Sequence, residues 1–178
     1  MPSRVTMLDL ISHSPEQTRR IGIHLGKLAQ PGDVFLLRGS LGSGKTTLAQ
    51  GIARGLDVQE AVRSPTFVLA SEHHGHLPDG SPVRLYHIDL YRLEEPGELA
   101  TFGLMDYLDD PAGVVVVEWP ERAGFEVLEQ YLVIELEFLA DTKRRLVFYP
   151  TGERYQRLVE SLRAEVAGGR RRSTAPGD

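Results

Sequence analysis

Hydrophobic positions recur along this chain in two patterns, which predict where strands and helices lie. Two continuous apolar runs, DVFLL at 33–37 and GVVVVE at 113–118, predict buried strands. Further extended segments pair around the PDGS turn at 78–81 and around Asp141 and Thr142, which predicts two hairpins. Because the hairpins interrupt the alternation of strands and helices, we expect an α/β sandwich around a central mixed β-sheet flanked by helices.

Helical spacing and start signals predict the helices. A first helix is expected over 15–30, with Ser14 as N-cap and Gln17 completing a capping box. A second is expected over 45–56, and short helical turns over 95–110. A closing helix carries one apolar face, made of Tyr155, Leu158, Val159, Leu162 and Val166.

Composition narrows the class of protein. The chain has 178 residues, of which 41% are hydrophobic and 25% charged, values typical of a globular domain. Without cysteine it can form neither a disulfide nor a thiolate metal site, and its net charge of −5 disfavours extended nucleic-acid binding. We find neither an apolar run near the roughly 18 residues of a membrane span nor a signal-peptide pattern, so we expect a cytoplasmic protein. Residues 1–167 are expected to form one domain, and 168–178 a disordered basic tail.

The stretch GSLGSGKTT at 39–47 matches the pattern of a phosphate-binding loop. It follows a predicted strand and opens a predicted helix, as that loop requires. Gly39 and Gly44 permit a backbone whose amides turn inward around phosphate, and the helix start adds unpaired amides. Lys45 can reach the outer phosphates, and the Thr46 hydroxyl can ligate Mg²⁺. The stretch predicts that the chain binds a nucleoside triphosphate, and we expect ATP with Mg²⁺.

A phosphate-binding loop needs a second metal-directed carboxylate on a neighbouring strand. Glu118 ends the run VVVVE, and Asp89 ends the segment LYHID in a weaker version of the same pattern. A carboxylate at a strand end can also be merely solvated. Both residues remain candidates.

Five segments follow one another along the chain: GSLGSGKTT, SPTF, YHIDLYRL, GLMDYL and VVVEWPE. Together they resemble the TsaE (YjeE) family of small bacterial ATPases, which are needed to make threonylcarbamoyladenosine in tRNA. The resemblance covers roughly residues 10 to 150 and implies a P-loop NTPase-like fold. One departure is Ser40, where family members usually carry an acid; it changes the rim of the loop and leaves the phosphate cradle intact.

The resemblance also implies roles for single residues. The phosphates of ATP would contact Leu41, Gly42, Ser43, Gly44, Lys45 and Thr46. Thr46 and Glu118 would hold Mg²⁺, and Thr66 would approach the γ-phosphate or the metal as a switch threonine does. Asp89 would position metal-bound or attacking water. Pro15 and Arg144 would border the nucleotide.

The same resemblance implies that the chain hydrolyses ATP for the TsaD–TsaB protein pair, and that it meets tRNA only through these partners. We see no arginine finger near the loop, so we expect slow turnover alone and activation by a partner. A small-molecule kinase and a nucleotide-dependent binding module remain alternatives. A GTP switch is disfavoured because TKRR at 142–145 lacks the acid of a guanine-reading motif.

The single tryptophan and a group of histidines each allow a functional and a structural interpretation. Trp119, the single tryptophan, would couple the nucleotide state to local packing, or it fills the core. The residues His73, His74, His76 and Asp79 offer metal-ligand chemistry. They lie in a hairpin without an apolar shell to orient them, so we expect no functional metal there.

Overall fold

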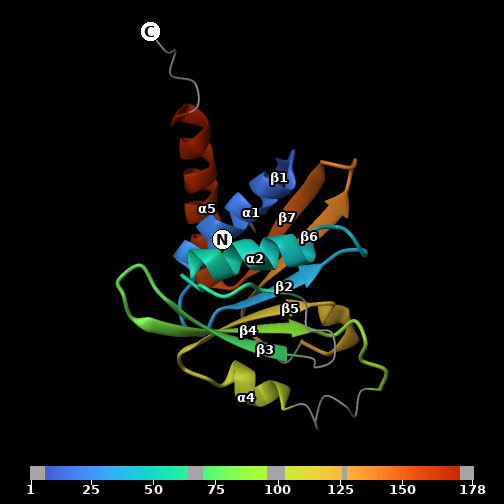
Figure 1. The fold of residues 1–178 in the computed structure, drawn as a ribbon, viewed down its shortest axis with the longest axis vertical. Helices are drawn as coiled ribbons and strands as arrows, with labels where there is room; N and C mark the ends of the chain where they lie inside the picture. Colours follow the sequence, from blue (N-terminus) through green and yellow to red (C-terminus); the bar gives the residue numbers. More distant parts are fainter. Residues whose placement is uncertain (1–6, 64–69, 96–102, 126–127, 173–178) are drawn as a thin grey trace, which may run out of the picture.

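The computed structural model describes residues 7–63, 70–95, 103–125 and 128–172. A seven-stranded mixed sheet with helices against it confirms the predicted fold class (Figure 1). The strands are β1 (Leu8–Ser12), β2 (Val34–Arg38), β3 (Ala70–His76), β4 (Pro82–Asp89), β5 (Gly113–Glu118), β6 (Tyr131–Phe138) and β7 (Arg144–Thr151). The helices are α1 (Pro15–Leu28), α2 (Lys45–Gly55), α4 (Leu104–Leu108) and α5 (Glu153–Arg172), with a 3₁₀ turn at Pro120–Arg122.

The strand order is β1-β7-β6-β2-β5-β4-β3, and both predicted hairpins, β3–β4 and β6–β7, are confirmed. At the centre, β2 runs parallel to β5 and to β6, and β4 runs parallel to β5. The carboxyl ends of β2, β5 and β4 therefore meet at one edge of the sheet. Ligands of open α/β sheets bind at such an edge.

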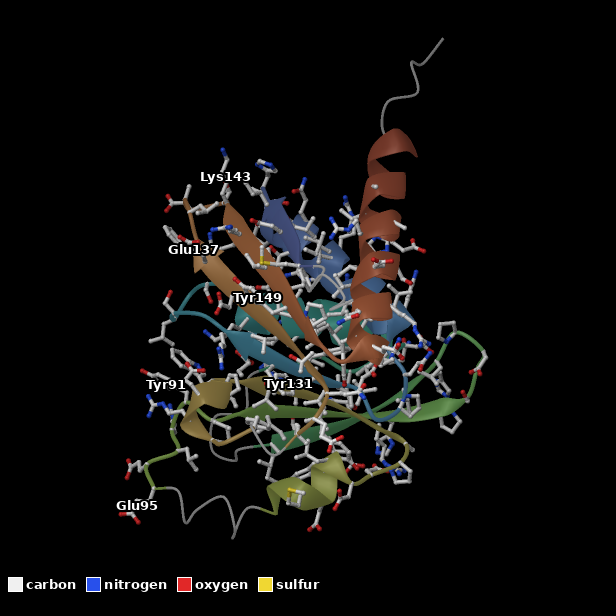
Figure 2. The ribbon with its side chains drawn as sticks, turned by 180° about the vertical axis from the view of Figure 1, so that it is seen from behind. Tyr91, Glu95, Tyr131, Glu137, Lys143 and Tyr149 are labelled. Atoms are coloured by element: carbon white, nitrogen blue, oxygen red, sulfur yellow. The ribbon has the colours of Figure 1, made fainter. Side chains whose placement is uncertain are left out.

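Two apolar layers hold the helices against the sheet. On one face α1, α2 and α5 pack over buried side chains that include Leu25, Phe35, Leu48, Ile52, Phe148 and Leu158. On the other face α4 and the segment after β5 cover Leu36, Ile88, Val115 and Val117. Figure 2 shows Tyr131, Glu137 and Tyr149 on the part of β6 and β7 that no described helix covers.

The first helix begins as predicted and ends two residues early. The Ser14 side chain accepts the amide of Gln17, and the Gln17 side chain accepts the amide of His13. At the other end Asp33 accepts the amide of Gln30 at 2.7 Å, which holds that amide outside α1.

Two features differ from the sequence prediction. The sequence predicts no strand at Leu8–Ser12, yet β1 pairs there with β7, more than a hundred residues away along the chain. The tail predicted to be disordered from 168 begins as helix, because α5 continues through Arg172. Arginine is a good helix former and extending a nucleated helix costs little. No helix within the described ranges is long and apolar enough to cross a membrane.

Candidate functional site

The loop between β2 and α2 adopts conformations that favour glycine. Gly39 has a φ of 154°, and a Cβ there would lie 2.6 Å from the carbonyl oxygen of Leu136. Gly44 has a φ of 103° and forms the N-cap of α2 without a side-chain cap. The first amides of a helix have no partner within the helix, so this loop and helix start suit an anion such as phosphate.

Lys45, the first residue of α2, turns its side chain back into the loop. Its Nζ donates to the carbonyl oxygens of Gly39 at 2.6 Å and Ser40 at 2.9 Å. Burial lowers the pKa of Lys45, and the nearby carboxylate of Glu118 opposes that shift. An ammonium held by backbone carbonyl oxygens of the loop can exchange these partners for the phosphate oxygens of a bound ligand.

Glu118 and Thr46 come together at the carboxyl end of the sheet. Glu118 ends β5, and the parallel register pairs it with Leu37 of β2, just before the loop. Its side chain is 3% exposed, and its Oε1 accepts from the Thr46 hydroxyl at 3.2 Å. A hydroxyl and a carboxylate beside a phosphate-binding loop are the hard oxygen ligands that Mg²⁺ prefers. The donor set at this edge therefore fits the predicted metal.

Asp89 lies beside this pair. It ends β4, and the register aligns it with Glu118 across the two parallel strands. Its Oδ1 accepts from the amide of Tyr91 at 3.0 Å. Burial raises the pKa of Asp89, and the charge of Glu118 adds to that rise. The second candidate carboxylate is thus at the same strand edge, where it can meet a ligand or its water.

His87 belongs to this cluster, although the sequence interpretation did not single it out. Its Nε2 lies 2.5 Å from Oε2 of Glu118, and its side chain is 1% exposed. The segment HID indicates that His87 lies on the same face of the strand as Asp89, because residues two apart in a strand point to the same face. His87 and Asp89 therefore share the face of β4 on which the site lies.

Trp119 packs against Lys45 and Tyr91. The Nζ of Lys45 lies 4.3 Å from the centroid of the indole, and the ring centroids of Tyr91 and Trp119 lie 5.0 Å apart. Trp119 is half-buried and has a φ of 60°, a conformation uncommon outside glycine. The indole therefore contacts both the loop lysine and part of the second apolar layer.

Arg144 joins the β6–β7 hairpin to the loop. Its guanidinium donates to the carbonyl oxygens of Gly42 at 3.1 Å and Ala140 at 2.6 Å, and it stacks 4.5 Å from the ring centroid of Phe138. The structure thus places Arg144 at the predicted site. Its role toward a nucleotide stays a prediction.

The other predicted loop contacts have different exposures. Leu41 is 67% exposed at the tip of the loop, whereas Ser43 is fully buried beside Lys45. Pro15 begins α1, and the methyl carbon of Thr18 in the next turn lies 3.9 Å from a Cβ built on Gly44. The start of α1 is thus beside the loop, while contact of Pro15 with a nucleotide stays a prediction.

Thr66, the predicted switch threonine, lies outside the described residues. The histidines of the β3–β4 hairpin are described, and each lies near a different carboxylate. The pairs are His73 with Glu60, His74 with Glu72, and His76 with Asp57. Within the described ranges, no three or more His, Cys, Asp or Glu side chains are grouped so that they could hold a metal ion.

Known proteins match most of the chain. The family model described as Threonylcarbamoyl adenosine biosynthesis protein TsaE matches residues 12–146. The tRNA threonylcarbamoyladenosine biosynthesis protein TsaE of Bacillus subtilis is 38% identical over 150 residues, 84% of this chain and 89% of that protein. The protein of the same name from Nostoc sp. is 44% identical over 115 residues, 62% of this chain and 67% of that protein. A crystal structure of Bacillus subtilis YdiB matches with a TM-score of 0.72 and 32% identity, over 91% of this chain and 97% of that chain.

Proposed function

This chain belongs to the TsaE family of tRNA threonylcarbamoyladenosine biosynthesis proteins, and from that premise we propose that it is a Mg²⁺-dependent ATPase. It converts ATP and water to ADP and phosphate in the cytoplasm. Its turnover supports the TsaD–TsaB complex, which carries out the modification, and the chain meets tRNA only through these partners.

One observation carries the proposal: the Thr46 hydroxyl and the Glu118 carboxylate lie 3.2 Å apart at the start of α2. Thr46 and Glu118 would hold Mg²⁺, and that ion would neutralise charge developing on the transferred phosphoryl group. Lys45 would exchange its backbone carbonyl partners for phosphate oxygens. Asp89 would orient the attacking water from the neighbouring strand end, where burial and Glu118 raise its pKa.

The contacts of Arg144, the arginine next to the loop, are an argument that the chain alone hydrolyses ATP slowly. Arg144 donates to carbonyl oxygens of the loop and of its own hairpin, so it is engaged in holding the loop. An arginine that reaches the transferred phosphoryl group raises the rate of related enzymes by about 10³–10⁵-fold. We expect the TsaD–TsaB complex to accelerate turnover, by supplying such a group or by reshaping the loop.

Phosphate release by the purified chain, alone and with TsaD and TsaB, tests the proposal. We expect slow release that rises with the partners, stops with a chelator, and is lost in Lys45→Ala and Glu118→Ala. Lys27→Ala, which removes an exposed lysine from the last turn of α1, is the matched control and should retain the rate.

The two alternatives predict different products. A small-molecule kinase would transfer phosphate to an acceptor, so ADP would form faster than free phosphate. A binding module would retain nucleotide and release no phosphate even with the partners present. Either result would reject the ATPase proposal.

A further inference from the structure

His87 is a buried ionisable residue to which the proposed ATP chemistry gives no part. It lies in β4, is fully buried, and pairs in register with Val116 of β5. Placing a histidine in a strand core costs free energy unless its polar atoms are hydrogen-bonded. The contacts of its two ring nitrogens therefore indicate what the residue does.

Only one of the two nitrogens has a hydrogen-bond partner within the described residues. Nε2 lies 2.5 Å from Oε2 of Glu118, whereas Nδ1 is buried without a partner. A carboxylate that ligates a metal is ionised and can only accept, so a role for Glu118 as metal ligand requires Nε2 to be the donor in this contact. Among the described residues, the hydrogen-bond partner of the ring is Glu118.

The two oxygens of Glu118 have different nearest partners. Oε2 lies 2.5 Å from Nε2 of His87 and 3.5 Å from the Thr46 hydroxyl, which is nearer to Oε1, at 3.2 Å. A carboxylate free to rotate could present either oxygen, or neither, to a metal beside Thr46. A bond from a rigid strand residue removes that freedom. Partners behind metal ligands commonly fix ligand orientation in this way.

We propose that His87 is a positioning residue for the metal ligand Glu118: its Nε2–H bond holds Oε2, so that Oε1 stays directed at the metal position beside Thr46. The inference rests on the proposed Mg²⁺–nucleotide site and adds a residue to it. A purely structural role for His87 would affect folding, but it would not act selectively on the metal.

The test compares nucleotide affinity with and without metal. Calorimetry measures binding of the non-hydrolysable ATP analogue AMPPNP in Mg²⁺ and in EDTA, and the ratio of the two affinities is the readout. His87→Gln places an amide donor near the position of Nε2, whereas His87→Asn is too short to reach Glu118. His73→Gln is the matched control. His73 lies on the edge strand β3, is also buried, and bonds the carboxylate of Glu60 at 2.6 Å.

We expect His87→Asn and His87→Leu to reduce the Mg²⁺-dependent gain in affinity by about 10–100-fold. His87→Gln should restore most of it, and His73→Gln should leave it unchanged. If His87→Leu fails to fold, the comparison of His87→Gln with His87→Asn still tests the role of His87. The role of His87 would be overturned if Mg²⁺ raised AMPPNP affinity equally in His87→Gln and His87→Asn. It would also be overturned if His87→Leu retained the wild-type gain in affinity.

Failure of the proposed site would look different. A wild-type chain whose AMPPNP affinity is the same in Mg²⁺ and in EDTA would overturn the metal site and the role of His87 together. A wild-type chain with a clear Mg²⁺ gain that survives every His87 variant would overturn only the inference.

Discussion

Replacing Gly22 by alanine should force apart α1 and α2, the two helices beside the proposed phosphate-binding loop. Gly22 in α1 packs directly on the backbone of α2. A Cβ at this position would lie 2.5 Å from the carbonyl oxygen of Leu48, 2.9 Å from the Cα of Gly51 and 3.0 Å from the amide nitrogen of Ile52. All three atoms belong to the main chain, so no side-chain rotation can relieve the overlap.

The size of the effect follows from these distances. Ordinary van der Waals contact begins at 3.4 Å, so the helices must separate by about 0.9 Å at this point. Overpacking a close contact costs about 1–3 kcal/mol, and two facing backbones place this case near the upper limit. Alanine regains about 1 kcal/mol of helix propensity relative to glycine. We therefore expect a net loss of about 2 kcal/mol, which for a chain of this size lowers the melting temperature by roughly 4–8 °C.

Thermal and urea unfolding of Gly22→Ala measure this loss. Gly168→Ala is the matched control: it makes the same substitution in α5, where an added Cβ meets nothing within 4 Å. That variant should be as stable as the wild type or gain up to about 1 kcal/mol. A Gly22→Ala variant as stable as Gly168→Ala would refute the reasoning, because it would mean that the helices adjust without cost.

Three further predictions concern stability and the site. Tyr155→Phe removes a 2.8 Å bond to the first amide of β2 and leaves that amide buried without its partner, so urea unfolding should show a loss of about 1–3 kcal/mol. Hydrogen bonds from Arg84 hold the pKa of Asp110 well below its usual range, and this contribution to stability is present above about pH 4 and lost at lower pH. The destabilisation by Asp110→Asn should therefore be largest near pH 7 and shrink below pH 4 in urea titrations; a difference independent of pH would contradict the assignment. Because the Nζ of Lys45 lies 4.3 Å from the centroid of the Trp119 ring, ATP should change tryptophan emission in the wild type and not in Lys45→Ala. An equal change in both would contradict the proposed movement of the lysine.

The parts of the fold and site that depend on local sequence could be predicted. The glycines before Lys45 and the apolar run before Glu118 specify the loop, the helix start and the strand-end acid within a few residues. Both hairpins were likewise predictable because their turns lie between extended segments. The motif resemblance to TsaE is confirmed by the family match over residues 12–146.

The parts that depend on contacts distant in sequence could not be predicted. The segment Leu8–Ser12 becomes a strand only by pairing with β7. The bond between His87 and Glu118 requires β4 and β5 to be neighbours in register, and nothing in either segment alone reports that register. Arg144 reaches the carbonyl of Gly42 across 102 positions of sequence. In each case the strand order supplies the partner.

Formation of threonylcarbamoyladenosine in a reconstituted system tests the central claim most directly. The reaction would contain tRNA, the enzyme that supplies the activated threonylcarbamoyl group, TsaD and TsaB, with this chain added as wild type or as Glu118→Ala. The account predicts multiple rounds of modification with the wild type and ATP. It predicts that these further rounds are lost with Glu118→Ala. They are also lost when the activated group is formed first and AMPPNP then replaces the ATP available to this chain. Equal yields with wild type and Glu118→Ala would contradict it, because ATP hydrolysis by this chain would then be irrelevant to the modification.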